Sequence, residues 1–278
     1  MEEWQERSDV DRLDLRADCS RCVGLCCVAP AFAASADFAI DKPAGQPCPH
    51  LGARFRCTIH DNLRGRGFAG CTVFDCFGAG QKVTQSSFGG MDWRRSPDLA
   101  DRMFAVFGVV RVLHELLWYL VEALKLEPAR SVHNELRAAL DTTEALTLAD
   151  ADVLAGTDVT AHRRNVNALL LQASDLARAT KPQHAVDLRG ASLVGRSLKG
   201  ADLRGASLRG ALLVGADLRD ADLRWADVTG ADFRGARLAG SDLSSSLFLT
   251  QAQLDSAQGD ARTHLPPDRR RPAHWPGS

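Results

Sequence analysis

The sequence lacks cysteine after position 76, although eight cysteines lie between positions 19 and 76. It also lacks a strong charge bias, because 34 Lys plus Arg stand against 35 Asp plus Glu, for a net charge of −1. A near-neutral chain has no global field that attracts nucleic acid or an anionic membrane. We therefore expect no direct nucleic-acid binding. Because the part after position 76 has no cysteine, we expect it to fold by burying ordinary apolar side chains.

Secretion and membrane signals are weak. The acidic start MEEWQERSDVDRLDLRADC lacks the basic region and the apolar stretch of a secretory signal. The most apolar window, residues 103–126, is interrupted by Arg111, Glu115 and Glu122, so it offers no uncharged run of about 18 residues to cross a bilayer. The sequence predicts a buried amphipathic helix here, no membrane partner and a cytoplasmic location, where clustered cysteines bind metal or do redox chemistry more often than they form disulfides.

Fingerprints of common enzyme classes are missing as well. The sequence contains no recognisable nucleophile triad or phosphate-binding glycine loop. The stretches FGAGQ (77–81) and FGGMDW (88–93) lack the spacing of a nucleotide-binding loop and are interpreted as turns. The sequence favours a protein that is not an enzyme, and a metal-dependent enzyme is the alternative.

Composition divides the chain into four parts, which predicts a multidomain α+β protein. Residues 1–95 hold every cysteine, with many Gly and Pro and few helical runs, so we expect a loop-dominated domain with little apolar core. Residues 96–181 predict a small helical bundle. Its first helix starts at Ser96 and Pro97, after which apolar residues recur every three or four positions. Residues 182–250 form the third part and residues 251–278 the fourth.

The third part repeats every five residues. From Val186 to Thr250 thirteen consecutive units follow the pattern A-D-L-x-x, with Leu at the centre of ten and Ala two positions earlier in nine. A period of five fits neither a helix nor a strand and indicates a solenoid. The units resemble the pentapeptide-repeat family. The resemblance implies a right-handed, quadrilateral β-solenoid with four units per coil and with Leu and Ala pointing inward.

Three features of this region lead to further expectations. Arg196 occupies an inward position, so we expect it to bend out of the coil or to pair with a carboxylate. Val194, Leu212 and Val214 form an apolar strip on one side, which we expect the chain's own helices to cover. At the end, Thr250 begins a capping turn, and Trp275 either folds back on the last coil or belongs to a disordered tail.

The cysteines are spaced as C-x2-C-x3-CC followed by four single residues. Close pairs such as Cys19 and Cys22 suit a metal, because one tight turn directs two thiolates at one ion. Eight thiols suffice for two closed sites of four, or for one iron–sulfur cluster with spare ligands. The other interpretations are small buried hydrophobes and a thiol redox relay. His50 and His60 are additional ligand candidates, although such residues are more often structural.

The opening C-x2-C-x3-CC also resembles the YkgJ-type family of zinc- or iron-chelating domains. CPHL (48–51) and CTIH (57–60) correspond to two later steps of that family, with His60 where the family has Tyr, and RGRGFAGC (64–71) to a third with a longer gap. The resemblance implies bound zinc or an iron–sulfur cluster. The candidate metal ligands are Cys19, Cys22, Cys26, Cys27, Cys48, Cys57, Cys71 and Cys76.

These features favour a metal- or iron–sulfur-binding interaction protein whose solenoid is a docking scaffold for an unidentified protein partner. The oligomeric state stays open. One alternative is an iron–sulfur or thiol redox sensor. Another is DNA mimicry to inhibit or protect gyrase, as in some pentapeptide-repeat proteins. Mimicry needs about one negative charge per 1.7 Å of axis, whereas residues 186–248 carry eight Asp against nine Arg plus Lys.

Overall fold

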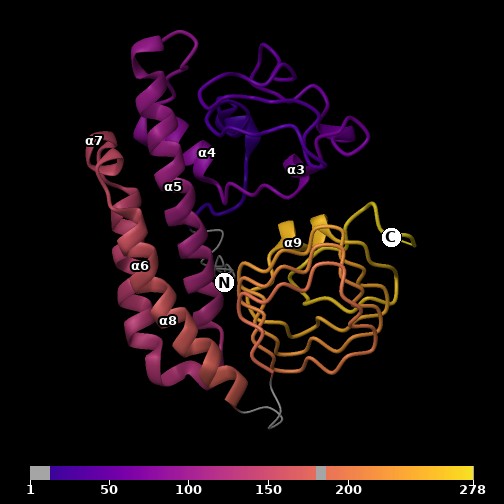
Figure 1. Ribbon diagram of the computed structural model, residues 1–278. Helices are drawn as coiled ribbons and strands as arrows, with labels where there is room; N and C mark the ends of the chain where they lie inside the picture. The colour runs from indigo at the N-terminus through magenta and orange to yellow at the C-terminus, as the bar shows by residue number, and fades with distance from the viewer. Residues whose placement is uncertain (1–12, 180–185, 278) are drawn as a thin grey trace, which may run out of the picture. The chain divides into compact units, whose positions relative to one another are not determined.

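The computed structural model describes residues 13–179 and 186–277 (Figure 1). The chain divides into two compact units: Met1–Lys125 with Val132–Leu170, and Leu126–Ser131 with Leu171–Ser278. The boundary falls inside helix α8 (Val159–Ala179), which contributes residues to both units. The division into four parts that was made from composition stays a prediction. Each of the two compact units is described by itself.

The cysteine-bearing part of the first unit consists of short helical turns joined by loops. These turns are η1 (Cys19–Arg21), α2 (Leu25–Val28), η2 (His60–Asn62), α3 (Ala69–Thr72), α4 (Ala79–Lys82) and the π-helical turn η3 (Val83–Ser87). Two antiparallel bridges, Phe32 with Lys42 and Leu51 with Cys57, close the intervening loops. Both glycine stretches singled out in the sequence contain turns, since Gly78, Gly89 and Gly90 have positive φ.

The predicted helices are confirmed. They are α5 (Pro97–Leu124), η4 (Glu127–Val132), α6 (His133–Thr147), α7 (Ala151–Ala155) and α8. Ser96 is the N-cap residue of α5 and Pro97 is its first residue, as predicted, because the missing N–H of proline costs nothing in the first turn. α5 packs against α6 and α7 and also against α2 and α4. Its apolar stripe, including Met103, Val110 and Leu117, is buried.

By length and composition α5 could also cross a membrane, and it is the one such helix in the described ranges. Its most apolar window, however, is 61% buried inside the protein. A core helix passes the same test, so the finding fits the predicted role of α5 as a buried amphipathic helix.

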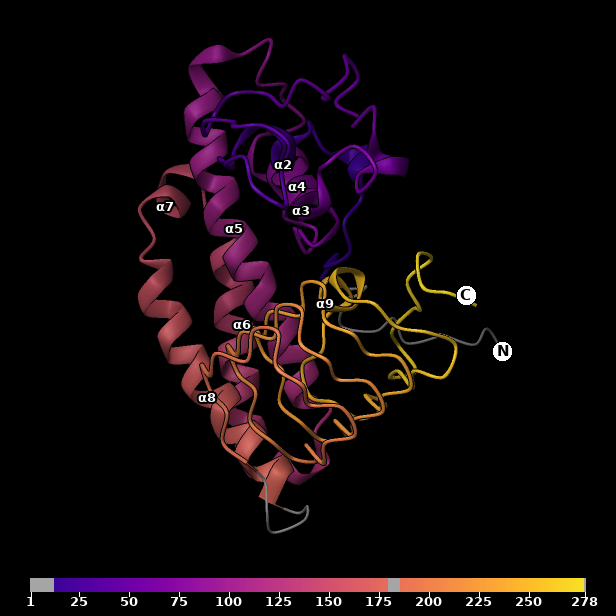
Figure 2. The ribbon, with the colours of Figure 1, turned by 45° about the vertical axis from the view of Figure 1, so that its right-hand side comes forward.

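The repeats form stacked coils in the second unit (Figures 1 and 2). Backbone bridges join the second residue of a repeat to its counterpart four repeats further along, as in the parallel ladder Asp187–Ser207–Asp227–Leu247. Four five-residue units therefore complete one coil, and the central Leu and preceding Ala form a common buried core from Leu203 onward. In the described residues all of this pairing consists of isolated bridges without extended strands. The reason is that each five-residue repeat turns a corner after a single paired residue. The right-handed twist stays a prediction.

Backbone geometry at the corners explains why glycine is frequent at the fifth position of the repeat. Most units end in glycine with φ near 65°, for example Gly190 and Gly205, whose φ values are 63° and 66°. Asp220 and Trp225 take the same left-handed conformation without being glycine, with φ of 58° and 62°. Such residues carry a steric cost that glycine avoids.

The end of the solenoid is capped as predicted. Thr250 and Gln253 form a reciprocal capping box at the start of α9 (Gln251–Ser256). Trp275 is 2% exposed in the solenoid core and donates a 3.0 Å hydrogen bond from Nε1 to the carbonyl oxygen of Ala257, so the disordered-tail alternative is wrong. Arg196, in the first coil, is exposed, as expected of a charge at an inward position.

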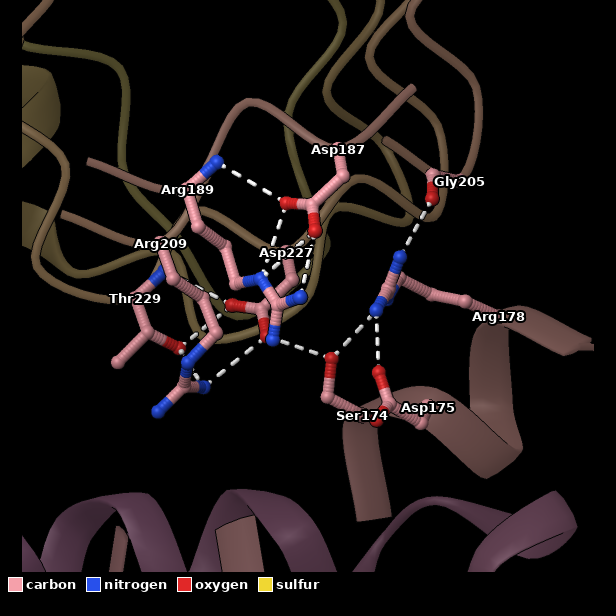
Figure 3. Close-up of polar contacts among 9 residues, drawn as sticks. All are labelled: Ser174, Asp175, Arg178, Asp187, Arg189, Gly205, Arg209, Asp227 and Thr229. Atoms are coloured by element: carbon pink, nitrogen blue, oxygen red, sulfur yellow. Dashed lines mark hydrogen bonds and ion pairs between the residues drawn. The ribbon is translucent and has the colours of Figure 1, made fainter. Parts of the chain in front are cut away.

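The last turns of α8 contact the solenoid through polar groups (Figure 3). Ser174 Oγ donates to Asp227 Oδ2 at 2.5 Å, and Arg178 donates to the carbonyl oxygen of Gly205 at 3.0 Å. Arg209 also donates to Asp227, at 3.0 Å. The apolar strip lies elsewhere, and Val194 and Leu212 are 54% and 45% exposed. Within the second unit the end of α8 therefore does not cover this strip but binds the buried carboxylate of Asp227, and docking of other helices on the strip stays a prediction.

Candidate metal centre

All eight cysteines are free, and packing divides them into two sets. Cys22, Cys26 and Cys76 pack against the core that α2, α4 and α5 build. Cys27, Cys48, Cys57 and Cys71 belong to a separate apolar cluster around Ile59, Leu63 and Phe68. Electrostatic coupling adds Cys19 to the first set, because its charge acts on Cys22. We call the two sets the first thiol group (Cys19, Cys22, Cys26 and Cys76) and the second thiol group (Cys27, Cys48, Cys57 and Cys71).

The two groups meet at the Cys26–Cys27 peptide in α2. Successive residues of a helix point about 100° apart, so adjacent thiols are directed to different neighbours. Their sulfurs are 3.9 Å apart and share a hydrogen bond. This bond raises the pKa of the half-buried Cys26, a rise to which loss of solvent also contributes, and it lowers the pKa of Cys27.

Side chains after Cys76 position the first thiol group. Gln81 is 1% exposed and bridges to the segment before Cys19, because its Nε2 donates to the carbonyl of Arg16 at 2.7 Å and its Oε1 accepts from the Asp18 amide at 3.0 Å. Thr84 Oγ1 accepts from the amide of Val23 at 3.3 Å. The segment around Cys22 and the segment after Cys76 are thereby held together, which brings thiols from the two ends of the cysteine-rich region into one group.

Gly80 lets the first thiol group close. A Cβ built at this position would lie 2.7 Å from Cys22 Sγ and 4.0 Å from Cys76 Sγ. The first distance is shorter than real contacts allow, so glycine leaves the space in which the Cys22 sulfur lies. The conformation itself does not require glycine, since the φ of Gly80 is not in the left-handed region.

Backbone hydrogen bonds assemble the second thiol group. The Cys48 amide donates to the carbonyl of Cys27 at 2.9 Å, and the Leu51–Cys57 bridge brings Cys57 back toward Cys48. The Cys71 amide donates to the carbonyl of Phe68 at 3.0 Å. Burial raises the pKa of Cys71 to about 11, and nearby thiolates of the same group add to this rise.

Lys42 lies beside the second thiol group. It is 4% exposed, and its Nζ donates to the carbonyls of Val28, Pro43 and Gln46 at 3.1, 3.1 and 2.9 Å. Burial lowers the pKa of Lys42, while the negative charges of Cys48 and Cys27 oppose that shift.

The donor chemistry of both groups fits a thiophilic metal, since four thiolates are the ligand set of structural zinc and of common iron–sulfur clusters. In residues 13–179 and 186–277 no set of three or more His, Cys, Asp or Glu side chains is arranged so that it could hold a metal ion. The two histidine candidates are not in the thiol groups. His50 packs edge-on to Phe68 with ring centroids 5.0 Å apart, and His60 is exposed.

Sequence reasoning identified the eight thiols but missed the residues that position them. Gln81 and Gly80 lie in FGAGQ, which was interpreted as a turn, and Lys42 had no distinguishing neighbour. The rarity of lysine was a usable signal for Lys42, because the sequence has only five lysines against 29 arginines.

Comparison with known proteins adds a family. The pentapeptide-repeat model matches residues 184–220 and 216–248. Over 265 residues the chain is 56% identical to "Uncharacterized protein YybG" of Bacillus subtilis (strain 168), an alignment that covers 94% of this chain and 95% of YybG. The chain belongs to the YybG family. Since the alignment covers 94% of the chain, the similarity of this YybG-family protein to the Bacillus protein extends well beyond the repeats.

Solved pentapeptide-repeat structures resemble part of this YybG-family protein. HetL from Nostoc sp. strain PCC 7120 is 32% identical, over 29% of this chain and 34% of HetL, with a TM-score of 0.21. The protein alr5209 from Nostoc PCC 7120 is 33% identical, over 31% of this chain and 78% of alr5209, with a TM-score of 0.22. The aligned part of HetL is about a third of that protein, and at these TM-scores the likeness adds nothing to the repeat assignment.

Proposed function

We propose that this protein is a non-enzymatic, cytoplasmic interaction protein in which zinc or iron–sulfur sites stabilise the cysteine-rich region and the pentapeptide repeats are a scaffold for a protein partner. The observation that supports the metal sites is the division of eight free thiols into two groups of four. Four thiolates complete a closed structural site without a water position, which is the arrangement of a stabilising metal.

A stabilising metal compensates for the small apolar core of this region. The apolar cluster around the second thiol group contains few fully buried side chains, with Ile59, Leu63 and Phe68 at its centre. So small a core contributes little to the free energy of folding. Binding of a structural metal adds directly to folding free energy. The resemblance of the cysteine spacing to YkgJ-type chelating domains supports the same proposal.

The surface of the repeats supports a scaffold better than a DNA mimic. Within a repeat the Asp before the central apolar residue pairs with the Arg after it, as in Asp202 with Arg204 at 2.6 Å and Asp232 with Arg234 at 2.7 Å. Negative charge is thereby neutralised within such units and cannot imitate a phosphate backbone. The exposed Val194 and Leu212 interrupt this charged surface.

Metal analysis of anaerobically purified full-length protein tests the proposal. We expect either a colourless protein with two zinc ions per chain or a coloured one with iron and sulfide. Cys22→Ser should remove the metal of the first thiol group, and Cys57→Ser that of the second, each leaving the other site loaded. Fewer than one zinc ion or cluster per chain, or loss of both metals from either variant, would contradict it.

A redox sensor is the second candidate, and the contact between the Cys26 and Cys27 sulfurs favours it. A coloured protein whose visible absorption bleaches with dilute peroxide, with loss of iron, would support this candidate. A colourless zinc protein would exclude the iron–sulfur version.

A further inference from the structure

The two thiol groups have different electrostatic surroundings. The charges that act most on Cys26 and Cys76 are those of other thiols and of the Asp75 carboxylate. Beside the second thiol group lies a buried ammonium group, Lys42. Its Nζ donates to the carbonyl oxygen of Val28, the residue after Cys27, at 3.1 Å and to that of Gln46, two positions before Cys48, at 2.9 Å. The feature that distinguishes the second group is this buried ammonium group, which is 4% exposed.

Lys42 is held in place by hydrogen bonds that leave its charge uncancelled. An ammonium group has three donors, and the three carbonyls of Val28, Pro43 and Gln46 accept them. All three acceptors are neutral. Val28 follows Cys27 directly and Gln46 lies just before Cys48, so the lysine joins the two segments that bring these thiols together.

Neutralisation of charge matters at such a site. A divalent metal with four thiolates carries a net charge of −2, and burying net charge is costly unless an opposite charge is near. A fixed cation beside the site lowers that cost, more strongly at low dielectric than in water. Lys42 supplies this cation at one thiol group.

We propose that Lys42 is a positioning residue that makes the second thiol group the tighter of the two metal sites, so that this group fills first and the first group exchanges its metal more readily. The proposal rests on the metal-binding function proposed above. Exposure distinguishes the two groups at one residue, because Cys19 of the first group is exposed, whereas its other three thiols are half-buried like most of the second group.

The experiment isolates each site in the full-length chain. In the Cys22→Ser background the second thiol group remains, and in the Cys57→Ser background the first remains. Zinc affinity is measured under reducing, oxygen-free conditions by competition with a chromophoric chelator. We expect tighter zinc binding in the Cys22→Ser background. There Lys42→Met should weaken binding by about tenfold or more, while in the Cys57→Ser background the same change should have no effect.

Two further variants separate charge from tethering. Lys42→Gln retains hydrogen-bond donors without charge and should weaken binding as Lys42→Met does, whereas Lys42→Arg should restore it. Lys82→Met is the matched control, a half-buried lysine whose charged neighbours are Glu144 and Asp14. Equal affinities at the two sites, equal weakening at both by Lys42→Met, or wild-type affinity in Lys42→Gln would overturn the inference and leave the proposed function standing. Absence of zinc binding in the unsubstituted chain would overturn both.

Discussion

Ser174 and Asp227 are 53 positions apart in the chain, yet their side chains are joined by a 2.5 Å hydrogen bond and neither is exposed to solvent. Asp227 also accepts from Arg209 and from the backbone and hydroxyl of Thr229 (Figure 3). The carboxylate is thus fully bonded at the place where α8 meets the solenoid. A buried charge is tolerated when its hydrogen-bond capacity is used in this way.

Ser174→Ala should therefore destabilise the protein by about 1 to 3 kcal/mol, because it removes one donor from a buried carboxylate. Ser207→Ala is the matched control. Ser207 lies one coil from Asp227 in the same ladder, and its Oγ is a buried group for which the described residues provide no hydrogen-bond partner. That variant should be neutral or slightly stabilising. Urea unfolding followed by circular dichroism measures both, and equal effects of the two substitutions would contradict the role of Ser174.

Gly80→Ala should displace the Cys22 sulfur, since the added Cβ would lie 2.7 Å from it. If the first thiol group binds metal, the zinc content of this variant falls from two ions per chain to one. Gly108→Ala, on an exposed face of α5 where nothing lies within 4 Å of the new Cβ, should keep both ions. It should also stabilise the helix by about 0.5 to 1 kcal/mol. Elemental analysis and thermal unfolding report the two results.

Gly259→Ala should loosen the solenoid cap, because its Cβ would lie 2.4 Å from the Trp275 ring. Trp275→Ala removes a buried aromatic side chain and should cost about 3 to 5 kcal/mol. In the Trp275→Ala background the Gly259→Ala change should then cost much less, since the clash is gone. A double-mutant cycle from denaturant unfolding checks this coupling, and additive effects of the two changes would show that the close contact carries no energy.

His114 should make the first unit sensitive to acid. It is 2% exposed, its Nδ1 donates to the Phe77 carbonyl at 2.7 Å, and burial lowers its pKa to about 4, with Lys82 and Asp14 as charged neighbours. Between this value and the ordinary 6.5 the unfolded chain binds the proton more tightly. Stability is therefore complete above pH 6.5 and falls as the pH falls toward 4, by about 2 kcal/mol between pH 7 and pH 5.

His114→Gln should lose this part of the pH dependence. The comparison of the two proteins at equal metal content, by unfolding at pH 7 and pH 5, isolates His114, because thiol titration contributes to both. Parallel stability curves for the two proteins would rule out the buried histidine as the source.

Local patterns explain which parts of this fold could be predicted. The helices and the repeats follow from periods of about 3.6 and five residues, and the cap at Thr250 from its capping box with Gln253. The docking of α8 could not be predicted, since Ser174 is a single polar residue on a helix and its partner lies in a distant unit of a near-identical repeat. The surface on which α8 docks was misjudged for a related reason. The apolar side chains of the strip stand out in the repeat sequence, whereas Asp227 occupies the same repeat position as the other outward Asp residues.

The arrangement of the candidate metal centre also could not be predicted from local patterns. The eight thiols were evident, but the division between them was not, because neighbouring residues Cys26 and Cys27 enter different groups and Cys76 joins the earliest cysteines. Such interleaving depends on the direction of each side chain on α2 and on contacts made by Gln81, and no spacing rule encodes these.

Pairing between each repeat unit and the fourth unit after it sets which changes in length the solenoid accepts. An insertion or deletion of four units adds or removes one whole coil and returns every later side chain to the same face. A change of a single unit preserves the sequence pattern but rotates everything that follows by a quarter turn. Asp227 would then leave the face that meets Ser174, and the α9 cap would move to another side. The natural unit of insertion and deletion in this domain is therefore the whole coil, four times the repeat that is visible in the sequence.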